Sequence, residues 1–331
     1  MAKAKVAVVG ATGYAGAEIV RLLAGHPYAE VAIATSNRNP GKPITSECPW
    51  LDSDLVLSEF DPESMHVEVV FLCQEAGFAM THARTLINRS RVIDLSADFR
   101  LQNKEVFAKT YKMEHCDPDL AAVYGLPELV DRGEIAEACV VANPGCYPTA
   151  SLLGLVPLVK AGLVNGTVII DAKSGVSGAG RSRKESDYLF AELDGGFRAY
   201  AVAHHRHAPE IAQLSGCPIR FTPHLLPIPR GIHATIYAPV SSAPDLSGLY
   251  RGFYKESPFV RYVDALPNTK QVTGSNRCDI HATYDEETGY VVVCAVIDNL
   301  VKGAAGQAIQ NMNLTLEVPE TTGLPMNGVW P

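Results

Sequence analysis

The stretch that decides the fold is Val6-Ala7-Val8-Val9 followed by Gly10-Ala11-Thr12-Gly13-Tyr14-Ala15-Gly16. The apolar run predicts a buried strand, and the apolar spacing of residues 18–23 predicts a helix after the glycines. Glycines spaced G-x-x-G-x-x-G permit a tight turn and let backbone N–H groups approach a pyrophosphate at the helix N-terminus. The turn predicts a dinucleotide site, the alternative being an ordinary strand-to-helix connection. The predicted cofactor-binding residues here are Gly10, Thr12, Gly13, Tyr14, Ala15 and Gly16.

Strand-like and helical segments alternate through the first half of the chain. Further strands are predicted at residues 31–34, 67–72, 91–95 and 139–142. Alternation of this kind is typical of α/β proteins, and it predicts a Rossmann-type, doubly wound parallel sheet over residues 1–145.

From about residue 166 the pattern changes to longer, partly alternating apolar runs with few helices between them. These runs predict strands at residues 167–171, 219–222, 233–240, 260–263 and 290–297. We therefore predict a second, α+β domain on a mostly antiparallel sheet. Residues 302–314 form the last predicted helix, whose small residues allow close packing.

Composition narrows the classes of protein that fit this chain. At 331 residues, with 47% hydrophobic and 19% charged, the chain is long enough for two domains. Its net charge of −8 disfavours nucleic acid or an anionic membrane as a partner. An apolar run of about 18 residues and a secretory leader are both absent, so we expect a cytoplasmic protein. Eight cysteines without a C-x-x-C pair argue against a zinc site and a disulfide framework.

The choice of nicotinamide cofactor depends on the end of the second predicted strand. An NAD site favours an acidic residue there, which binds the ribose 2′-hydroxyl. This chain has Ser36 and Arg38 instead, a pair suited to a 2′-phosphate. We therefore predict NADP(H), with a solvated surface arginine as the alternative reading of Arg38.

The run Asn143-Pro144-Gly145-Cys146-Tyr147-Pro148-Thr149 places a cysteine on a turn ahead of an apolar stretch, 149–159, that predicts a helix. Unpaired N–H groups and the positive end of a helix dipole lower the pKa of a thiol at such a position. Cys146 is therefore the predicted nucleophile. The alternative is a small buried hydrophobic side chain.

Histidines cluster about sixty residues later, in the segment 204–210 with the sequence HHRHAPE. A cysteine and a histidine brought together by the fold can form a thiolate–imidazolium pair, and the histidine can then act as acid or base. His205 and His207 would share a face if their segment is extended. We predict no metal site, because a second cluster of ligands is missing.

The glycine-rich segment 173–184 carries hydroxyl groups and four cations, namely Lys173, Arg181, Arg183 and Lys184. Backbone amides and basic side chains of this kind suit a phosphate or a carboxylate, and a mobile solvated loop is the alternative. A cysteine nucleophile, NADP(H) and an anion site together predict the reductive dephosphorylation of an acyl phosphate to an aldehyde, or its reverse.

The sequence resembles the N-acetyl-γ-glutamyl-phosphate reductases of arginine biosynthesis, relatives of aspartate-semialdehyde dehydrogenase. The resemblance covers nearly the whole chain. The segments that carry it are GATGYAG (10–16), DLSADFR (94–100), NPGCYPT (143–149), SGVSGAGR (174–181), HRHAPEI (205–211), FTPHLLPIPRGI (221–232) and DNLVKGAAGQAIQNMN (298–313).

The resemblance implies a mechanism and an architecture. Cys146 would attack the γ-acyl phosphate, and one histidine of the His205/His207 pair, His207 in our choice, would be the acid/base. Reduction of the thioester would release N-acetylglutamate 5-semialdehyde. Residues 146–301 would form the catalytic and oligomerisation domain of a homodimer or homotetramer, and a final helix within about 302–331 would complete the first domain.

The matching motifs also supply the remaining predicted contacts. Those to the cofactor are Ser177, Gly178 and Asn299. Those to the substrate are Arg100, Asn143, Ser174, Arg181, Glu210 and Arg230. The chain departs from the family at Cys73-Gln74-Glu75, where a small residue and Pro-His are usual, and at His233, where an aliphatic residue is usual; His233 is assigned no role.

Three other functions fit parts of the pattern. A paralogous reductase would act on aspartyl phosphate or on a carrier-linked aminoadipyl phosphate. A non-catalytic NADP-sensing protein would keep the fold without needing an activated cysteine. A cysteine hydrolase would leave the dinucleotide turn without a purpose.

Overall fold

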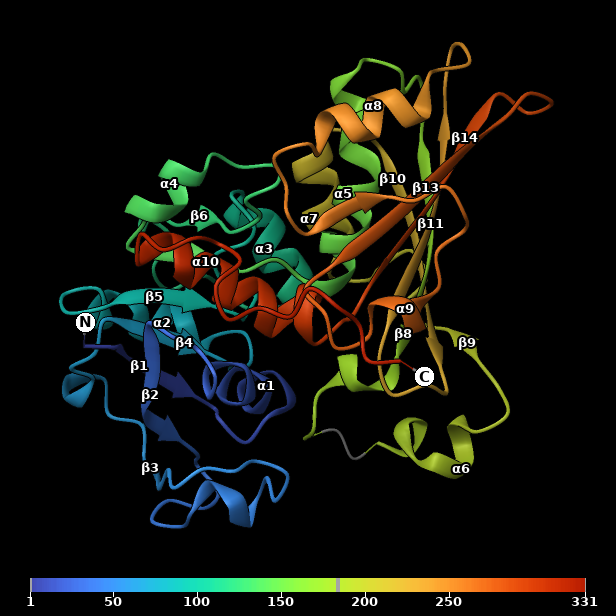
Figure 1. Cartoon of the computed structure of the whole chain (residues 1–331). Helices are drawn as coiled ribbons and strands as arrows, with labels where there is room; N and C mark the ends of the chain where they lie inside the picture. The colour runs from blue at the N-terminus through green and yellow to red at the C-terminus, as the bar shows by residue number, and fades with distance from the viewer. Residues whose placement is uncertain (1, 183–184, 331) are drawn as a thin grey trace. The chain divides into compact units, whose positions relative to one another are not determined.

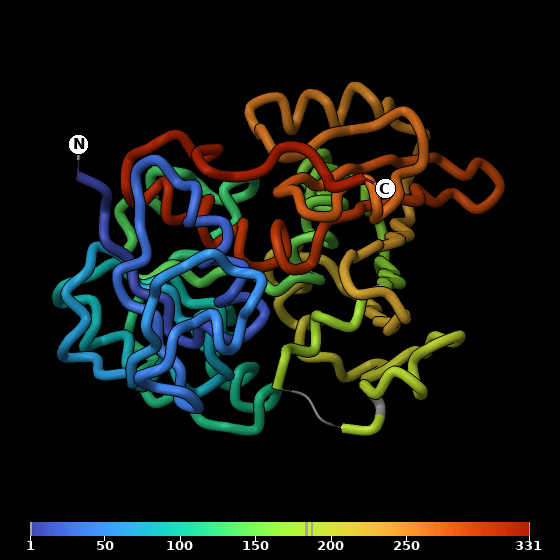
Figure 2. Tube along the Cα trace, turned by 60° about the horizontal axis from the view of Figure 1, so that its bottom comes forward, coloured from blue at the N-terminus to red at the C-terminus, as the bar shows by residue number. Residues whose placement is uncertain are grey.

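A computed structural model describes residues 2–182 and 185–330. The chain divides into two compact units. The first unit contains Met1–Pro144 and Ala304–Leu324, and the second contains Gly145–Gly303 and Pro325–Pro331. The chain thus leaves the first unit at Gly145, returns to it at Ala304 and ends in the second (Figure 2). The residues after Leu324, which we predicted to belong with the first domain, group with the second unit.

The first unit is built on a parallel sheet with the strand order β3-β2-β1-β4-β5-β7-β6 (Figure 1). Every pair of neighbouring strands in it is parallel. The strands are β1 (Ala4–Val9), β2 (Ala29–Thr35), β3 (Leu57–Ser58), β4 (Val69–Leu72), β5 (Arg91–Asp94), β6 (Val123–Tyr124) and β7 (Val140–Ala142). The order reverses beside β1, as in a doubly wound sheet, so the predicted fold of this unit is confirmed.

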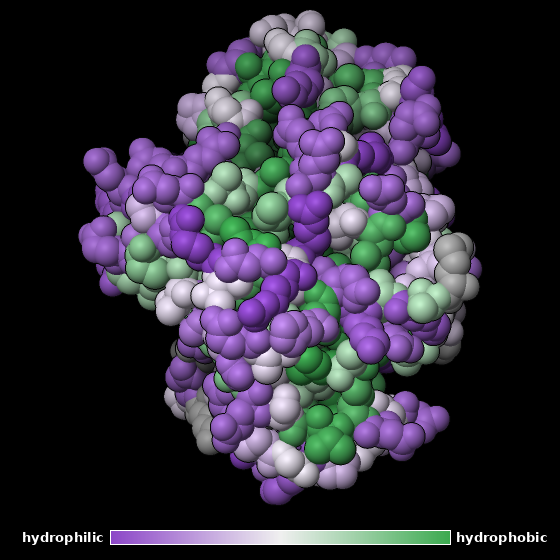
Figure 3. All heavy atoms as spheres, turned by 90° about the vertical axis from the view of Figure 1, so that its left-hand side faces the viewer, coloured by the Kyte–Doolittle hydropathy of each residue, from purple (hydrophilic) through white to green (hydrophobic). Residues whose placement is uncertain are grey.

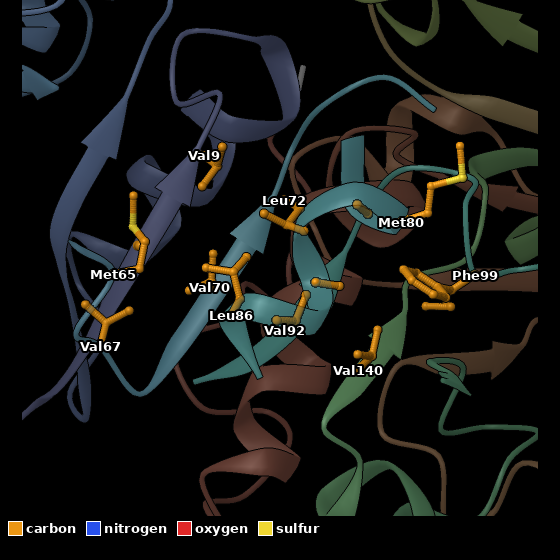
Figure 4. Close-up of a cluster of buried hydrophobic side chains, with 14 of the residues drawn as sticks. Val9, Met65, Val67, Val70, Leu72, Met80, Leu86, Val92, Phe99 and Val140 are labelled. Carbon is orange, nitrogen blue, oxygen red and sulfur yellow. The ribbon is translucent and has the colours of Figure 1, made fainter. Parts of the chain in front are cut away.

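Helices and short 3₁₀ turns connect these strands, namely α1 (Tyr14–Leu23), η1 (Ile44–Ser46), η2 (Pro62–Ser64), α2 (Phe78–Leu86), α3 (Lys104–Tyr111) and α4 (Arg132–Glu137). The first unit also contains α10 (Gly306–Thr315), which follows the last strand of the chain's described residues. Asn103 and Asp131 cap α3 and α4, because each side-chain oxygen accepts N–H groups of the first turn. One apolar cluster, drawn in Figure 4, packs Val70 and Leu72 of β4 with Leu86 of α2. Each fully buried side chain of this size stabilises the fold by about 1.5–3 kcal/mol.

The second unit is built on a mixed sheet with the order β12-β13-β14-β11-β8-β10-β9. The strands are β8 (Val168–Gly175), β9 (Arg198–Ala199), β10 (Ile219–Leu226), β11 (Ile232–Pro239), β12 (Val260–Tyr262), β13 (Cys278–Asp285) and β14 (Tyr290–Ile297). β8 with β10 and β12 with β13 are parallel pairs, and the other neighbours are antiparallel. A mostly antiparallel second sheet is therefore confirmed.

Helices α5, α7 and α8 lie on one face of this second sheet (Figure 1). The helical elements of the second unit are α5 (Cys146–Lys160), η3 (Val176–Ala179), η4 (Ser186–Tyr188), α6 (Phe190–Leu193), α7 (Ala208–Ser215), α8 (Leu246–Phe253) and α9 (Thr269–Val272). A π-helical turn, η5 (Val301–Ala305), connects β14 to α10. Gly154 of α5 lets the helix approach the sheet, because a Cβ atom there would lie 2.6 Å from Ile236 Cδ1.

Several local predictions differ from the structure, and the two-residue strands β3, β6 and β9 were not predicted. Helix α5 begins at Cys146, three residues before the predicted start, since Tyr147 and Pro148 fit its first turn. Strand β13 was missed, because polar residues such as His281 and Thr283 interrupt its apolar pattern. The final helix begins as a π-helical turn rather than at Lys302 as an α-helix.

Figure 3 shows one face of the molecule, on which hydrophilic side chains predominate and apolar side chains fill smaller areas between them. In the described residues, no helix combines the length and the apolar character needed to span a bilayer.

Candidate active site

The glycine turn of the first unit has the geometry of a pyrophosphate cradle. Gly10 has a φ of +85°, and a Cβ atom on it would lie 2.5 Å from the carbonyl oxygen of Cys73. A Cβ atom on Gly16 would lie 2.3 Å from the carbonyl oxygen of Gly10. Helix α1 begins at Tyr14, and its N-cap, Gly13, makes no side-chain cap to the first-turn N–H groups. The turn therefore needs glycine and presents backbone donors to an anion.

Ser36 and Arg38 follow β2 beside this turn. The Ser36 hydroxyl lies 3.3 Å from that of Thr12 and accepts the Arg38 backbone N–H at 3.4 Å. Ser36 is buried, whereas the Arg38 side chain is exposed. The residues predicted to contact the cofactor in the first unit therefore lie in and next to one turn, and the exposed Arg38 has a guanidinium suited to a phosphate.

The segment Asp94–Arg100 organises the carboxyl end of β5. Asp94 is fully buried and accepts the Ser96 N–H at 2.7 Å. Burial, followed by the nearby Asp98 carboxylate, raises the pKa of Asp94 to about 7. The Asp98 carboxylate accepts N–H groups at the start of α2, including that of Met80 at 2.9 Å. Sequence reasoning assigned no role to either carboxylate.

Two predicted substrate residues lie in the interior of the first unit. Arg100 donates through Nε to the carbonyl of Asn143 at 2.8 Å and through a terminal nitrogen to that of Leu95 at 2.7 Å. The Asn143 amide donates to the Ala304 carbonyl at 3.2 Å and accepts from Asn311 at 3.0 Å. Both side chains are more than nine-tenths buried. These contacts join the ends of β5 and β7 to the returning segment that begins at Ala304.

Cys146 is the first residue of α5 in the second unit. Its N-cap, Gly145, donates its backbone N–H to Glu210 Oε1 at 2.9 Å, while Thr149 donates its hydroxyl to the Gly145 carbonyl at 3.0 Å. Glu210 is 1% exposed and belongs to the first turn of α7. The predicted substrate residue Glu210 thus contacts the backbone from which Cys146 projects. The N-terminal position of the thiol favours its thiolate.

Tyr147 brings the predicted histidines next to this helix start. Its ring centroid lies 5.5 Å from that of His205 and 5.9 Å from that of His207, both edge-on. Its hydroxyl donates to the carbonyl of His224 at 3.2 Å, and the Tyr200 hydroxyl donates to it at 3.1 Å. The two histidines lie on a turn that enters α7, not on an extended segment, yet their rings are 4.9 Å apart. The fold therefore brings a cysteine turn and a histidine pair to one place.

The glycine-rich segment after β8 packs against the connection between β10 and β11. A Cβ atom on Gly175 would lie 2.7 Å from the Ile228 carbonyl oxygen. Asn299 donates to the Ser177 hydroxyl at 2.9 Å and accepts the Gly231 N–H at 2.7 Å. A Cβ atom on Gly178 would lie 3.2 Å from the Ser174 hydroxyl. The predicted residues Ser174, Ser177, Gly178 and Asn299 therefore form one connected loop structure.

The predicted cations of this region differ in their surroundings. Arg230 lies 3.4 Å from the buried Asp298 carboxylate, and its side chain is 30% exposed. Arg181 is exposed. Arg183 and Lys184 lie outside the described residues. The guanidinium of a partly exposed arginine is a group suited to a carboxylate or phosphate ligand.

Gly303 is a residue of this site that sequence reasoning missed. It belongs to the π-helical turn, and a Cβ atom on it would lie 2.9 Å from Cys146 Cβ and 3.3 Å from Ile297 Cδ1. π-helical turns often occur at functional sites. The backbone of this turn therefore packs directly against the Cys146 side chain.

Gly303→Ala is expected to slow the alkylation of Cys146 by iodoacetamide at pH 7 by roughly tenfold. The added methyl group displaces the Cys146 side chain from the helix N-terminus, where the helix dipole contributes up to about 2 kcal/mol to charge stabilisation. Gly252→Ala is the matched control, since nothing lies within 4 Å of its Cβ position in α8. Equal alkylation rates in both variants would contradict the close contact.

Comparisons of the sequence with known proteins identify the family to which both units belong. Residues 5–138 match the family described as the NAD binding domain of semialdehyde dehydrogenase, and residues 146–299 match its dimerisation domain. N-acetyl-γ-glutamyl-phosphate reductases from Citrifermentans bemidjiense and Geobacter sp. strain M21 are each 48% identical over 347 residues, covering 99% of both chains. The enzyme of that name from Pelotomaculum thermopropionicum is 46% identical over 346 residues, again with 99% of both chains covered.

Solved structures of similar fold are more distant in sequence. Aspartate semialdehyde dehydrogenase II of Vibrio cholerae, complexed with ASA, has a TM-score of 0.72 and 18% identity, covering 96% of this chain and 99% of that one. The Candida albicans aspartate semialdehyde dehydrogenase with NADP has a TM-score of 0.70 and 15% identity, with the same coverage. These structures have the same two-domain fold as this chain. The relatives that are 46–48% identical in sequence identify the family within the semialdehyde dehydrogenases. The chain belongs to the N-acetyl-γ-glutamyl-phosphate reductase family of the semialdehyde dehydrogenases.

Proposed function

We propose that the protein reduces N-acetyl-γ-glutamyl phosphate with NADPH, giving N-acetylglutamate 5-semialdehyde and phosphate through a cysteinyl thioester, a step of arginine biosynthesis. The observation that carries this proposal is the placement of Cys146 at the start of α5, with two buried histidine rings against the neighbouring Tyr147. Relatives 48% identical over their full length have the matching name. A cysteine and a histidine held in this way suit acyl transfer.

The chain's own residues account for the covalent chemistry. The Cys146 thiolate attacks the γ-acyl carbon and phosphate leaves, so the acyl group becomes a thioester. NADPH, when bound, supplies the hydride that reduces this thioester. His207 gives a proton to the departing phosphate, and after hydride addition the oxyanion on the acyl carbon collapses to the aldehyde as the thiolate is released. In the reverse reaction, His207 takes the proton of the thiohemiacetal hydroxyl. The turn from Gly10 to Gly16 is the proposed site of the cofactor pyrophosphate, supported by its close backbone packing, in which a Cβ atom on either glycine would clash with a carbonyl oxygen.

We assign the remaining contacts from the geometry of each unit. Arg181 and Arg230 are the proposed donors to the substrate anions, supported by the exposure of their side chains. Ser174 and the loop from Ser177 to Asn299 would shape the site around them. Arg100 and Asn143 would support the strand ends that carry this chemistry, not contact the substrate directly.

A second copy of the chain is the proposed protein partner. The dimerisation domain of the family matches residues 146–299. The helices of the second unit cover one face of its sheet, and side chains on the other face, such as Ile169, are partly exposed, at 43% for that residue. A homodimer or homotetramer of cytoplasmic protein is the assembly we expect.

A substrate panel tests the proposed function. Purified protein is expected to oxidise NADPH with N-acetyl-γ-glutamyl phosphate, and to reduce NADP with the semialdehyde and phosphate. Aspartyl phosphate and a carrier-linked aminoadipyl phosphate are the competing substrates. Turnover of either at a higher kcat/KM would assign the chain to a paralogous reaction, and turnover of none would favour a sensing role.

Arg38→Ala is expected to raise the KM for NADPH by roughly 10- to 100-fold and to leave the KM for NADH nearly unchanged. The reason is the loss of a charge-assisted contact to the 2′-phosphate, which NADH lacks. Steady-state kinetics with both cofactors measure the effect. An equal change for NADH would show that Arg38 acts through the fold of the turn.

A further inference from the structure

We propose that His205 is a positioning residue that remains neutral and orients His207, so that the proton of the reaction moves through His207 alone. The inference rests on the proposed function for its kinetic consequences. Its structural basis is independent of the substrate, because the second unit by itself contains all the groups involved.

The first observation is the direction of one hydrogen bond. The backbone N–H of His207 donates to His205 Nδ1 at 3.1 Å. A ring nitrogen that accepts a hydrogen bond carries no proton, so the neutral His205 ring has its proton on Nε2. A second proton on Nδ1 would point at the His207 N–H and break this contact. The hydrogen bond thus favours the neutral imidazole over the imidazolium.

The same hydrogen bond fixes the backbone position from which the His207 side chain projects. His207 is the N-cap residue of α7, and its backbone N–H is held at the point where the chain enters that helix. Glu210, three residues later, holds the N-cap of α5. His205 therefore fixes the backbone between the histidine pair, and Glu210 links the same helix start to the nucleophile.

The second observation is the aromatic surrounding of His205. Ring centroids of Tyr147, Tyr200 and Phe221 lie 5.3–5.5 Å from its own. The His207 ring lies 4.9 Å away at an interplanar angle of 72°. His205 is only 9% exposed, so an added charge would be poorly solvated.

The charged neighbours of His205 also favour its neutral form. Burial, followed by the electrostatic effects of Arg206 and His204, lowers the pKa of His205 to about 4. Burial also raises the pKa of Tyr200 to about 12, so its hydroxyl stays protonated and supplies no counter-ion. At neutral pH the ring therefore carries no charge.

The third observation is that the backbone just before His205 is strained. Ala201 and Ala203 have φ values of +45° and +63°, in the left-handed region that L-residues avoid. The Tyr200 N–H is bound to the Pro223 carbonyl at 3.1 Å, which ties the start of this turn to β10. Strained residues of this kind occur where the surrounding structure must hold a side chain in one place.

The test compares His205→Asn with His205→Leu. Asparagine keeps an acceptor near the position of Nδ1 but has no titrating proton, whereas leucine fills similar space without an acceptor. We expect kcat to fall about fivefold for His205→Asn and about 100-fold for His205→Leu. For His205→Asn the acidic limb of the kcat/KM profile stays at the pH of the unmodified protein. For His207→Gln that limb disappears and kcat falls at least about 1,000-fold.

A second readout requires neither substrate nor cofactor. The pH dependence of Cys146 alkylation by iodoacetamide is expected to be the same in the unmodified protein and in His205→Asn, and to change in His207→Gln. A shifted or lost acidic limb in His205→Asn, in either assay, would overturn the proposal, as would equal losses for asparagine and leucine. Because the alkylation assay is independent of the acyl phosphate, failure of the proposed function leaves this readout valid. Thermal unfolding of each variant identifies any that does not fold.

Discussion

Cys146→Ala is expected to lower turnover at least about 10⁴-fold, both for NADPH oxidation with the acyl phosphate and for NADP reduction with semialdehyde and phosphate. Without the sulfur no thioester forms, so proton transfer by a histidine cannot assist the reaction. Stopped-flow or steady-state absorbance at the nicotinamide band measures both directions. The side chain is only partly buried and small, so the variant should fold.

Two other cysteines provide the matched controls. Cys116 and Cys139 are exposed in the first unit, and alanine at either position should leave turnover within about twofold of the unmodified protein. NADPH should bind to Cys146→Ala with unchanged affinity, because Cys146 is not among the predicted cofactor contacts. Substantial turnover in Cys146→Ala would exclude the covalent route.

Gly16→Ala is expected to raise the dissociation constant for NADPH by at least about 100-fold and to lower the melting temperature by several degrees. The added Cβ atom would lie 2.3 Å from the Gly10 carbonyl oxygen, which is backbone and cannot rotate away. The turn must open, so the backbone N–H groups proposed to bind the pyrophosphate move apart. Fluorescence titration of NADPH and a thermal melt measure the two effects.

Gly25→Ala is the control for this substitution. It lies in the same unit, and nothing is within 4 Å of its Cβ position. The control should bind NADPH as the unmodified protein does, with unfolding free energy changed by no more than about 1 kcal/mol. If Gly16→Ala also bound NADPH normally, this turn would not be the cofactor site.

The fold class was predictable because its determinants are local. The glycine turn from Gly10 to Gly16 lies between a strand and a helix within one short stretch of chain, and the predicted sheet is confirmed. The start of α5 was placed too late, because Pro148 suggests a break in the chain while it fits the first helical turn. Strand β13 was missed because its exposed face carries polar side chains.

The candidate site was only partly accessible from the sequence. Cys146 and the histidines are conspicuous by residue type and spacing, although their assigned roles remain proposals. The contact of Glu210 with Gly145 spans 65 positions, and no local pattern encodes it. The role of Gly303 depends on a steric approach to Cys146 that only coordinates reveal. Arg100 illustrates the opposite case, since its charge suggests a ligand contact and its donors are directed to backbone carbonyls.

The returning segment Ala304–Leu324 has a consequence for how the protein is made. Asn311 in α10 donates to the Gly125 carbonyl at 2.9 Å, and a Cβ atom on Gly125 would lie 2.3 Å from the same amide nitrogen. The packing of the first unit is therefore complete only after the segment Ala304–Leu324, which follows the whole of Gly145–Gly303, has been synthesised. A fragment that ends at Pro144 would lack part of the interior of its own domain, so this domain cannot fold completely during synthesis until Ala304–Leu324 is available.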